Sequence, residues 1–256
     1  MVERKEYLKS LIEWKDERII KVVTGIRRCG KSTLLSQYKD WLISNGVSED
    51  QIISINFEDL EFEELLDYKK LYDYLNNRLV KGRMTYIFMD EVQNVPCFEK
   101  TVDSIYIRDG VYVYITCSNA WMLSGDLATL LTGRYVEIKM LPLSFREFLE
   151  VSGMEKMEGF AEYMHNGSFP FLASMNRTAD KVESYLEGIY NTVIVKDIEA
   201  RQARKGNDPD KRRVSDLVLL KTISRYLSSV IGSPVSVRSI ADYLSSNGRK
   251  ISPTTG

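Results

Sequence analysis

Apolar and polar positions along the first half of the chain fall into blocks that predict strands separated by helices. Five runs rich in β-branched and aromatic residues predict strands at residues 18–25, 51–59, 85–92, 111–119 and 134–141. Helical spacing of apolar residues predicts helices at residues 6–15, 32–46, 63–80, 98–110 and 120–131. Strands alternating with helices predict an α/β domain whose parallel sheet is covered on both faces.

The pattern changes near residues 140–143, and from there the chain predicts helices with no strong strand. Helical segments are expected at residues 142–151, 157–167, 179–204, 214–232 and 236–248. Ser236 is expected to cap the last of these, and Ser252 followed by Pro253 is typical of another helix start. We therefore expect the chain to end inside a helix-turn-helix unit.

Composition narrows the class of protein. The 256 residues are 44% apolar and 28% charged, with a formal net charge of −1, so the whole chain is not a polycation. It has no apolar run long enough to span a membrane, and its first ten residues lack the apolar core of a signal peptide. Three widely spaced cysteines indicate neither a disulfide framework nor a zinc site. A cytoplasmic protein without a membrane partner is expected.

The segment from Gly25 to Ser32 fits the phosphate-binding pattern G-x-x-x-x-G-K-[ST] between a predicted strand and a predicted helix. Glycines let backbone N–H groups converge on phosphate oxygens, and a helix N-terminus adds partial positive charge. Lys31 would reach the β- and γ-phosphates, and the Ser32 hydroxyl would bind Mg²⁺. The residues expected to contact the nucleotide are Gly25, Ile26, Arg27, Arg28, Cys29, Gly30, Lys31, Ser32 and Thr33.

Two adjacent carboxylates follow the third predicted strand, in the segment YIFMDEVQ. In α/β folds ligands bind at the carboxyl ends of the strands, where Asp90 and Glu91 would lie. Asp90 is predicted to hold Mg²⁺ through water. Glu91 is predicted to orient and polarise the attacking water. The alternative is an acidic strand end with no catalytic part.

Each of two further candidate site residues, Asn119 and Arg134, has an alternative structural explanation. Polar residues Thr116, Ser118 and Asn119 end the fourth predicted strand, where a γ-phosphate sensor would hydrogen-bond, and Asn119 is the residue assigned to that part. Ordinary helix capping explains the same residues. Arg134 would face a neighbouring subunit's nucleotide as an arginine finger if the protein forms a ring. A surface arginine or an intrachain salt bridge explains it equally well.

The order of the P-loop, MDEVQ, ITCSN, LTGRYVEIKMLPLSFREFL and YMHNGSFP resembles prokaryotic AAA-type ATPases that carry a poorly characterised C-terminal domain. The resemblance implies a P-loop NTPase fold of the AAA+ type, with five parallel strands and the P-loop strand central. It implies three parts: an ATPase core at residues 1–140, a helical lid at 141–209 and a partial winged-helix segment at 210–256. Lys31, Ser32, Asp90 and Glu91 match the family's nucleotide-site positions, and the preference for adenine follows from the resemblance.

The expected function is Mg²⁺-dependent ATP hydrolysis that moves the lid and the C-terminal part. The alternative is a nucleotide-dependent switch that binds a partner or DNA with negligible turnover. Residues 201–214 carry six basic residues and two acids, a net charge of +4, which suits a nucleic-acid backbone or an exposed loop. A protein client through the C-terminal segment and assembly into a homo-oligomer both stay open.

Overall fold

The computed structural model describes residues 2–118, 131, 133–176, 178–204 and 217–248. The chain divides into two compact units, Met1–Val182 and Glu183–Gly256. The first unit therefore contains the whole sheet together with the first helices that follow it. This division does not test the functional limits expected at residues 140 and 209, which stay predictions.

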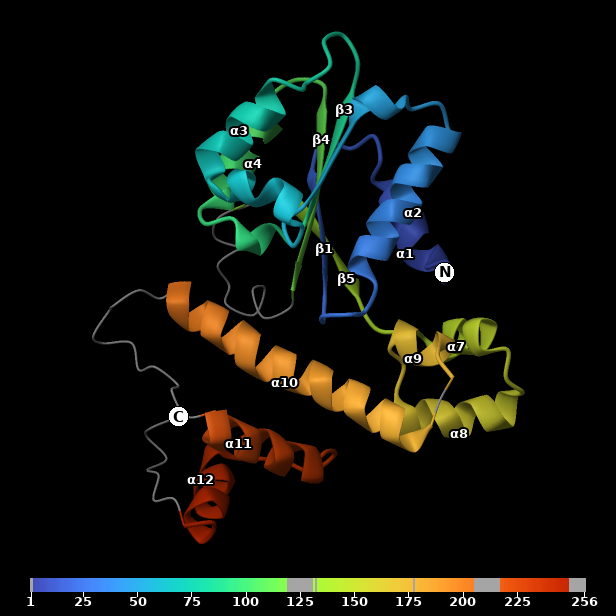
Figure 1. Cartoon of the computed structure of the whole chain (residues 1–256), viewed down its shortest axis with the longest axis vertical. Coiled ribbons are helices and arrows are strands. Elements are labelled where there is room, and N and C mark those ends of the chain that lie inside the picture. Colours follow the sequence, from blue (N-terminus) through green and yellow to red (C-terminus); the bar gives the residue numbers. More distant parts are fainter. Residues whose placement is uncertain (1, 119–130, 132, 177, 205–216, 249–256) are drawn as a thin grey trace. The chain divides into compact units, whose positions relative to one another are not determined.

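All five predicted strands are present in one parallel sheet (Figure 1). They are β1 (Ile20–Gly25), β2 (Ile52–Asn56), β3 (Thr85–Asp90), β4 (Val111–Ser118) and β5 (Tyr135–Met140). The strand order is β2-β3-β4-β1-β5. The strand before the phosphate loop, β1, is thus interior and pairs with β4 and β5, while β4 occupies the middle of the sheet.

Helices cover both faces of this sheet, as the strand–helix alternation predicts. Figure 1 shows α1 and α2 on one side and α3 and α4 on the other. Their bounds are α1 (Lys5–Glu13), α2 (Lys31–Ser44), α3 (Tyr68–Asn76) and α4 (Phe98–Tyr106). Single turns of 3₁₀-helix occur at η1 (Glu49–Gln51) and η3 (Val92–Asn94), and a longer one at η2 (Leu60–Leu66).

Side-chain alternation along the strands builds two separate cores. On β3, Ile87 and Met89 face the α3–α4 core, while Tyr86 and Phe88 face the α1–α2 core. The strand is buried on both faces, as expected for a parallel sheet sandwiched between helices. Packing in these two cores fixes the positions of the strand ends relative to α2, whose N-terminus forms part of the candidate site.

After the sheet, the first unit continues with α7 (Phe145–Ser152), α8 (Lys156–Asn166) and α9 (Pro170–Ser174). Ser144 caps α7 in a reciprocal capping box with Glu147. A small third core forms beneath these helices around Leu143, Phe148 and Ala173.

The second unit begins within α10 (Ala179–Arg204) and includes α11 (Leu217–Ser229) and α12 (Val237–Ser246). Tyr226 of α11 stacks on Tyr243 of α12 with ring centroids 4.4 Å apart. The predicted cap at Ser236 is confirmed, because its side chain accepts a hydrogen bond from the Ser239 N–H at 3.0 Å.

Two details differ from the sequence expectations. The helix expected at residues 63–80 is two elements, η2 and α3, because the Asp67 side chain accepts hydrogen bonds from the N–H groups of Lys69 and Lys70 and starts a new helix. The short helix α9 was not expected, although Pro170 occupies its first turn.

Several expectations fall outside the described residues: the helix at 120–131 apart from Leu131, the basic residues 205–213, and the helix start at Ser252. Among the residues that the structure does describe, no helix has both the length and the apolar character needed to cross a membrane.

Candidate functional site

The carboxyl ends of the parallel strands meet at one edge of the sheet. Gly25 is in register with Ser118 of β4 and with Met140 of β5. On the other half of the sheet, Asn56 is in register with Asp90. The sequence candidates at the ends of β1 and β3 therefore lie at the same edge, as the strand rule for α/β folds predicts.

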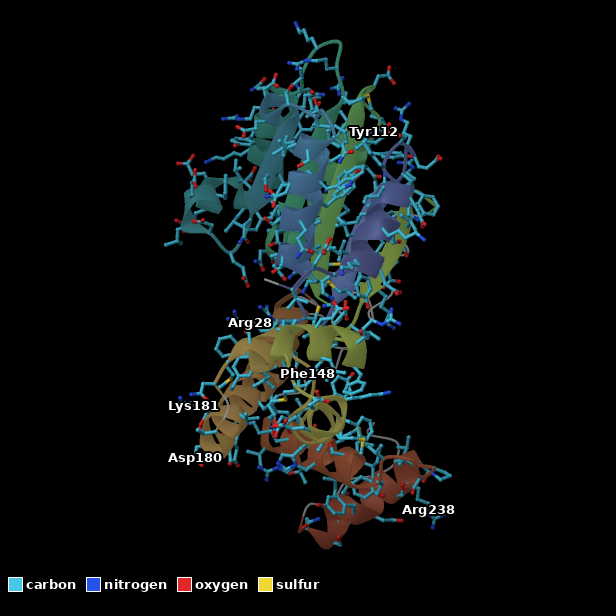
Figure 2. The ribbon with its side chains drawn as sticks, turned by 90° about the vertical axis from the view of Figure 1, so that its right-hand side faces the viewer. Arg28, Tyr112, Phe148, Asp180, Lys181 and Arg238 are labelled. Carbon is cyan, nitrogen blue, oxygen red and sulfur yellow. The ribbon has the colours of Figure 1, made fainter. Side chains whose placement is uncertain are left out.

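The connection from β1 to α2 is a loop that needs glycine at both of its ends. A Cβ on Gly25 would lie 2.5 Å from the Met140 carbonyl oxygen and 2.7 Å from the Cys29 Sγ, so no side chain fits there. Gly30 precedes α2 with φ 103°, and Arg28 has φ 67°, both in the left-handed region. Figure 2 shows Arg28 at this edge of the sheet, with Tyr112 toward its opposite end.

Lys31 is the first residue of α2, and its side chain is buried, with 3% of its surface exposed. The ammonium Nζ lies 3.2 Å from Glu91 Oε1 in an ion pair. It also donates a hydrogen bond to the Gly25 carbonyl oxygen at 3.3 Å. A buried ammonium needs such partners, and here they come from the start of the loop and from the residue after β3.

Asp90 ends β3 and is buried with two hydroxyl groups against its carboxylate. Burial raises the pKa of Asp90, and hydrogen bonds from Ser32 and Thr116 oppose that shift. The Thr116 Oγ1 donates to Asp90 Oδ1 and accepts from the Glu91 N–H at 2.8 Å. Thr116 on β4 thus joins the two acidic residues to each other.

Glu91 follows β3 in a left-handed conformation with φ 53°, which is uncommon for a residue with a side chain. This turn directs the Glu91 carboxylate back toward the loop. Oε1 pairs with Lys31, and Oε2 accepts a hydrogen bond from the Gln93 side-chain amide. The sequence patterns predicted no functional role for Gln93, although it lies in the motif MDEVQ, two residues after Glu91.

A family model described as an AAA domain matches residues 17–149, from the segment before β1 into α7. The chain belongs to the AAA-type P-loop ATPase family. The match includes every residue of the phosphate loop and both acidic residues after β3. The resemblance inferred from the motifs is therefore confirmed at the level of the family.

Two curated relatives extend the likeness beyond the AAA domain. An uncharacterized protein of Haemophilus influenzae is 34% identical over 252 residues, covering 96% of this chain and 60% of that protein. An uncharacterized protein of Methanocaldococcus jannaschii is 28% identical over 250 residues, covering 91% of this chain and 52% of that protein. The chain thus spans little more than half the length of these relatives.

A solved structure shares the fold of this AAA-family chain. It is a Walker-type ATPase of Pyrococcus abyssi, with a TM-score of 0.56 and 18% sequence identity. The alignment covers 98% of this chain and 86% of that one. At this identity the likeness concerns the fold, which agrees with the five-stranded parallel sheet predicted from the sequence.

The remaining loop residues of the AAA domain have structural surroundings that bear on their expected contacts. Arg27 is partly exposed and lies 3.2 Å from Glu58 in an ion pair. Cys29 is fully buried, and burial raises the pKa of its thiol despite the nearby charges of Lys31 and Arg4. Cys29 is thus a small buried filler of the loop rather than an exposed thiol. Ile26 packs against the α1–α2 core, and Thr33 is half-buried on α2.

The described residues bring neither Asn119 nor Arg134 to the site. Asn119 lies outside the described residues, so its part as a sensor stays a prediction. Arg134 is 49% exposed on its side chain and forms an ion pair with Asp103 at 3.1 Å. That pair matches the intrachain alternative, and the finger in a second subunit stays a prediction.

Proposed function

We propose that this chain binds ATP with Mg²⁺ and hydrolyses it. One observation carries the proposal: Lys31, Ser32, Asp90 and Glu91 form a single bonded set at the carboxyl edge of the sheet. The phosphate loop supplies the first two residues and the end of β3 the others. Membership in the AAA-type family supports the same chemistry.

The magnesium site would use the Ser32 hydroxyl and the Asp90 carboxylate. Oxygen donors of this kind suit Mg²⁺, which is usually bound through one or two side chains together with phosphate oxygens and water. The hydrogen bond between Ser32 and Asp90 brings both donors together, so the residues fit the ion. A bound Mg²⁺ would supply charge neutralisation for the phosphate oxygens.

Glu91 would act on the water that attacks the γ-phosphorus. Its carboxylate is held by Lys31 and Gln93. Phosphate oxygens entering the loop would compete for the Lys31 ammonium, which leaves Glu91 Oε1 able to accept a proton from water. Lys31 would then neutralise negative charge that develops on the phosphoryl oxygens.

The same proposal has three further parts. The helices after the sheet would move when nucleotide binds, and the chain would assemble into a ring that uses Arg134. A protein or a nucleic acid would be its client. A cytoplasmic location is likewise part of the proposal. The competing function is a switch that binds ATP tightly without appreciable turnover. That alternative has support in the Lys31–Glu91 pair, because a glutamate that stays bonded to lysine cannot act as a base.

The test combines calorimetry with phosphate release. Wild-type chain is titrated with ATP and with GTP in the presence of Mg²⁺, and phosphate release is followed for wild type and Glu91→Gln. Selective ATP binding with release that depends on Glu91 supports the ATPase. Binding without release supports the switch, and a wild type that binds neither nucleotide would overturn both.

A further inference from the structure

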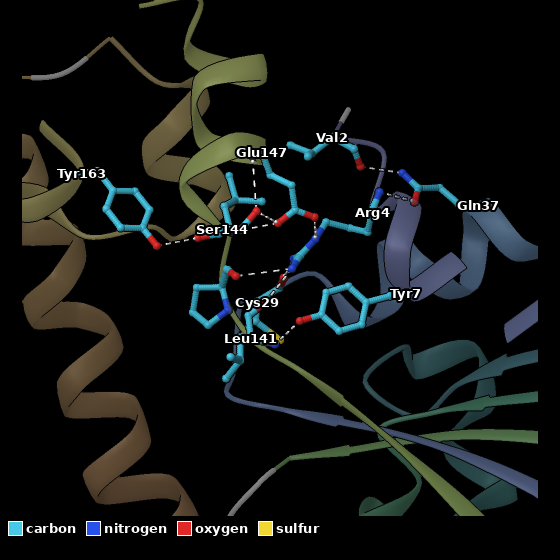
Figure 3. Close-up of polar contacts among 11 residues, drawn as sticks. Val2, Arg4, Tyr7, Cys29, Gln37, Leu141, Ser144, Glu147 and Tyr163 are labelled. Carbon is cyan, nitrogen blue, oxygen red and sulfur yellow. Dashed lines mark hydrogen bonds and ion pairs between the residues drawn. The ribbon is translucent and has the colours of Figure 1, made fainter. Parts of the chain in front are cut away.

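Arg4 stands before α1, yet its side chain reaches three segments around the phosphate loop (Figure 3). Nε donates to Glu147 Oε1 at 2.8 Å, and Nη1 donates to the Cys29 carbonyl oxygen at 2.9 Å. Nη2 donates to the carbonyl oxygens of Leu141 at 2.8 Å and of Pro142 at 3.3 Å. One guanidinium therefore joins the phosphate loop, the end of β5 and α7.

The Arg4 side chain is only 2% exposed, which makes it one of the largest fully buried side chains. A buried cation is stable only when its N–H groups are satisfied, and charge-assisted bonds of this kind are strong. The ring of Tyr7 lies 4.8 Å from the guanidinium, and Gln37 of α2 accepts from the Arg4 backbone N–H at 3.3 Å. These contacts hold the guanidinium in one place.

The bond to Cys29 controls a backbone group of the loop. The Cys29 carbonyl and the Gly30 N–H belong to one peptide unit, which is planar and trans, so the two point in opposite directions. Because Arg4 binds the Cys29 carbonyl oxygen, the Gly30 N–H is held pointing away from the Arg4 guanidinium. Backbone N–H groups at this position, just before a helix, are those that bind phosphate oxygens.

The bond to Glu147 reaches α7. Glu147 Oε2 accepts from the Ser144 N–H at 2.8 Å and from its hydroxyl at 2.9 Å, which completes the cap of α7. Oε1 of the same carboxylate pairs with Arg4. The N-terminus of α7 and the peptide unit at Cys29 are thus held by opposite ends of one ion pair.

We propose that Arg4 is a positioning residue that orients the Gly30 N–H toward a bound phosphate. Through its ion pair with Glu147, it also couples phosphate binding to the position and stability of α7. The inference rests on the proposed nucleotide binding and adds a route from the loop to the first helix after the sheet. Coupling of this kind is reciprocal: a phosphate that favours one orientation of the loop also stabilises α7 in contact with Arg4.

The test uses Mg²⁺ with tripolyphosphate, a probe that carries only the phosphate part of the ligand. Calorimetry gives its affinity, and hydrogen exchange gives the protection of residues 145–152 with and without the probe. In wild type, the probe should increase the protection of these amides. Arg4→Met should lower the affinity about tenfold or more, equivalent to about 1.4 kcal/mol, and abolish the protection change.

Glu147→Gln separates the two parts of the inference. It keeps the Arg4 bond to Cys29 but removes the charge that joins Arg4 to α7. The affinity for tripolyphosphate should stay within about threefold of wild type, while the protection change in α7 is lost. A variant that merely loosened the fold would lower affinity and protection throughout the unit instead.

Lys21→Met is the matched control, since Lys21 is another fully buried cation, on β1, bonded to the Glu17 carbonyl oxygen rather than to the loop. It should alter stability but leave both readouts as in wild type. If Arg4→Met does not fold, Arg4→Lys takes its place, because the three donors of an ammonium lie on one nitrogen and cannot reproduce the bonds that Nε, Nη1 and Nη2 of Arg4 make to separate acceptors.

The outcomes separate this inference from the proposed function. A wild type that fails to bind tripolyphosphate and ATP overturns the function itself. A wild type that binds, with folded Arg4 variants that bind equally well, overturns the part that Arg4 has in the loop. A Glu147→Gln variant whose α7 still gains protection overturns the coupling.

Discussion

The ion pair between Lys31 and Glu91 leads to a prediction about affinity rather than turnover. Both side chains are buried, and the Lys31 ammonium lies against the Glu91 carboxylate. A triphosphate must take Lys31 from this partner. The variant Glu91→Gln removes the competing charge and keeps the size of the side chain, so it should bind ATP more tightly than wild type.

The size of the effect follows from the distance. Two unit charges 3.2 Å apart attract by about 5 kcal/mol at an effective dielectric constant of about 20. Only part of this attraction opposes binding, because Lys31 exchanges one anion for another and the glutamine can still accept a hydrogen bond. We expect Glu91→Gln to bind at least about tenfold more tightly, which corresponds to about 1.4 kcal/mol.

The assay is calorimetry with a non-hydrolysable ATP analogue and Mg²⁺, so that turnover by the wild type does not disturb the comparison. Glu58→Gln is the matched control, since Glu58 pairs with Arg27 of the same loop at the same distance of 3.2 Å but is more exposed. Exposed pairs contribute about 0–1 kcal/mol, so the control should change affinity less than about fivefold. A folded Glu91→Gln variant that binds no more tightly than wild type would refute the reasoning.

Three further predictions concern stability. Thr116→Val removes both bonds that the hydroxyl makes to Asp90 and Glu91, and it should lower the free energy of unfolding in urea by about 2–4 kcal/mol, whereas Thr116→Ser should not. Burial lowers the pKa of Lys21 to about 8 in the folded protein, while the unfolded chain keeps the ordinary pKa of 10.5. Because the unfolded chain binds the proton more tightly, the free energy of unfolding should rise between pH 8 and 10.5 by up to about 3 kcal/mol, a rise that Lys21→Met should not show. Denaturation of both proteins at pH 7 and 10 checks this, and equal pH dependence would contradict it. Burial also raises the pKa of Asp90 above its unfolded value, so the ionised carboxylate is less stable in the folded protein than in the unfolded chain. Asp90→Asn should therefore raise the melting temperature of the ligand-free protein while losing the stabilisation by ATP with Mg²⁺; a lower melting temperature without ligand would contradict the first part.

The proximity of the four main candidate residues could be predicted, because their positions depend on local pattern and one topological rule. The phosphate-loop pattern places Lys31 and Ser32 between a strand and a helix. The apolar run before Asp90 and Glu91 identifies a buried strand with acids at its carboxyl end. Parallel strands bring those ends together, so the sequence predicts their proximity without any knowledge of side-chain contacts.

The contacts of Arg4 could not be predicted in the same way. Its partners lie 25 residues away at Cys29 and 143 residues away at Glu147. No periodicity links such positions, and an arginine before an amphipathic helix is ordinarily an exposed residue. Its burial becomes visible only when β1, β5 and α7 have been placed around it. The hydrogen bonds by which Thr116 joins Asp90 and Glu91 could not be predicted either, since they depend on the register between β3 and β4.

The bonds among the site residues explain how this chain can bury three ionisable side chains together, those of Lys31, Asp90 and Glu91. An isolated buried charge would be costly, but Lys31 neutralises Glu91, and hydroxyl groups satisfy Asp90. A nucleotide with Mg²⁺ would offer phosphate oxygens to Lys31 and the metal ion to Asp90, so binding would exchange the partners of these two charged groups. The same exchange would release Glu91 from Lys31 only when phosphate is present, which would confine its action on water to the nucleotide-bound state.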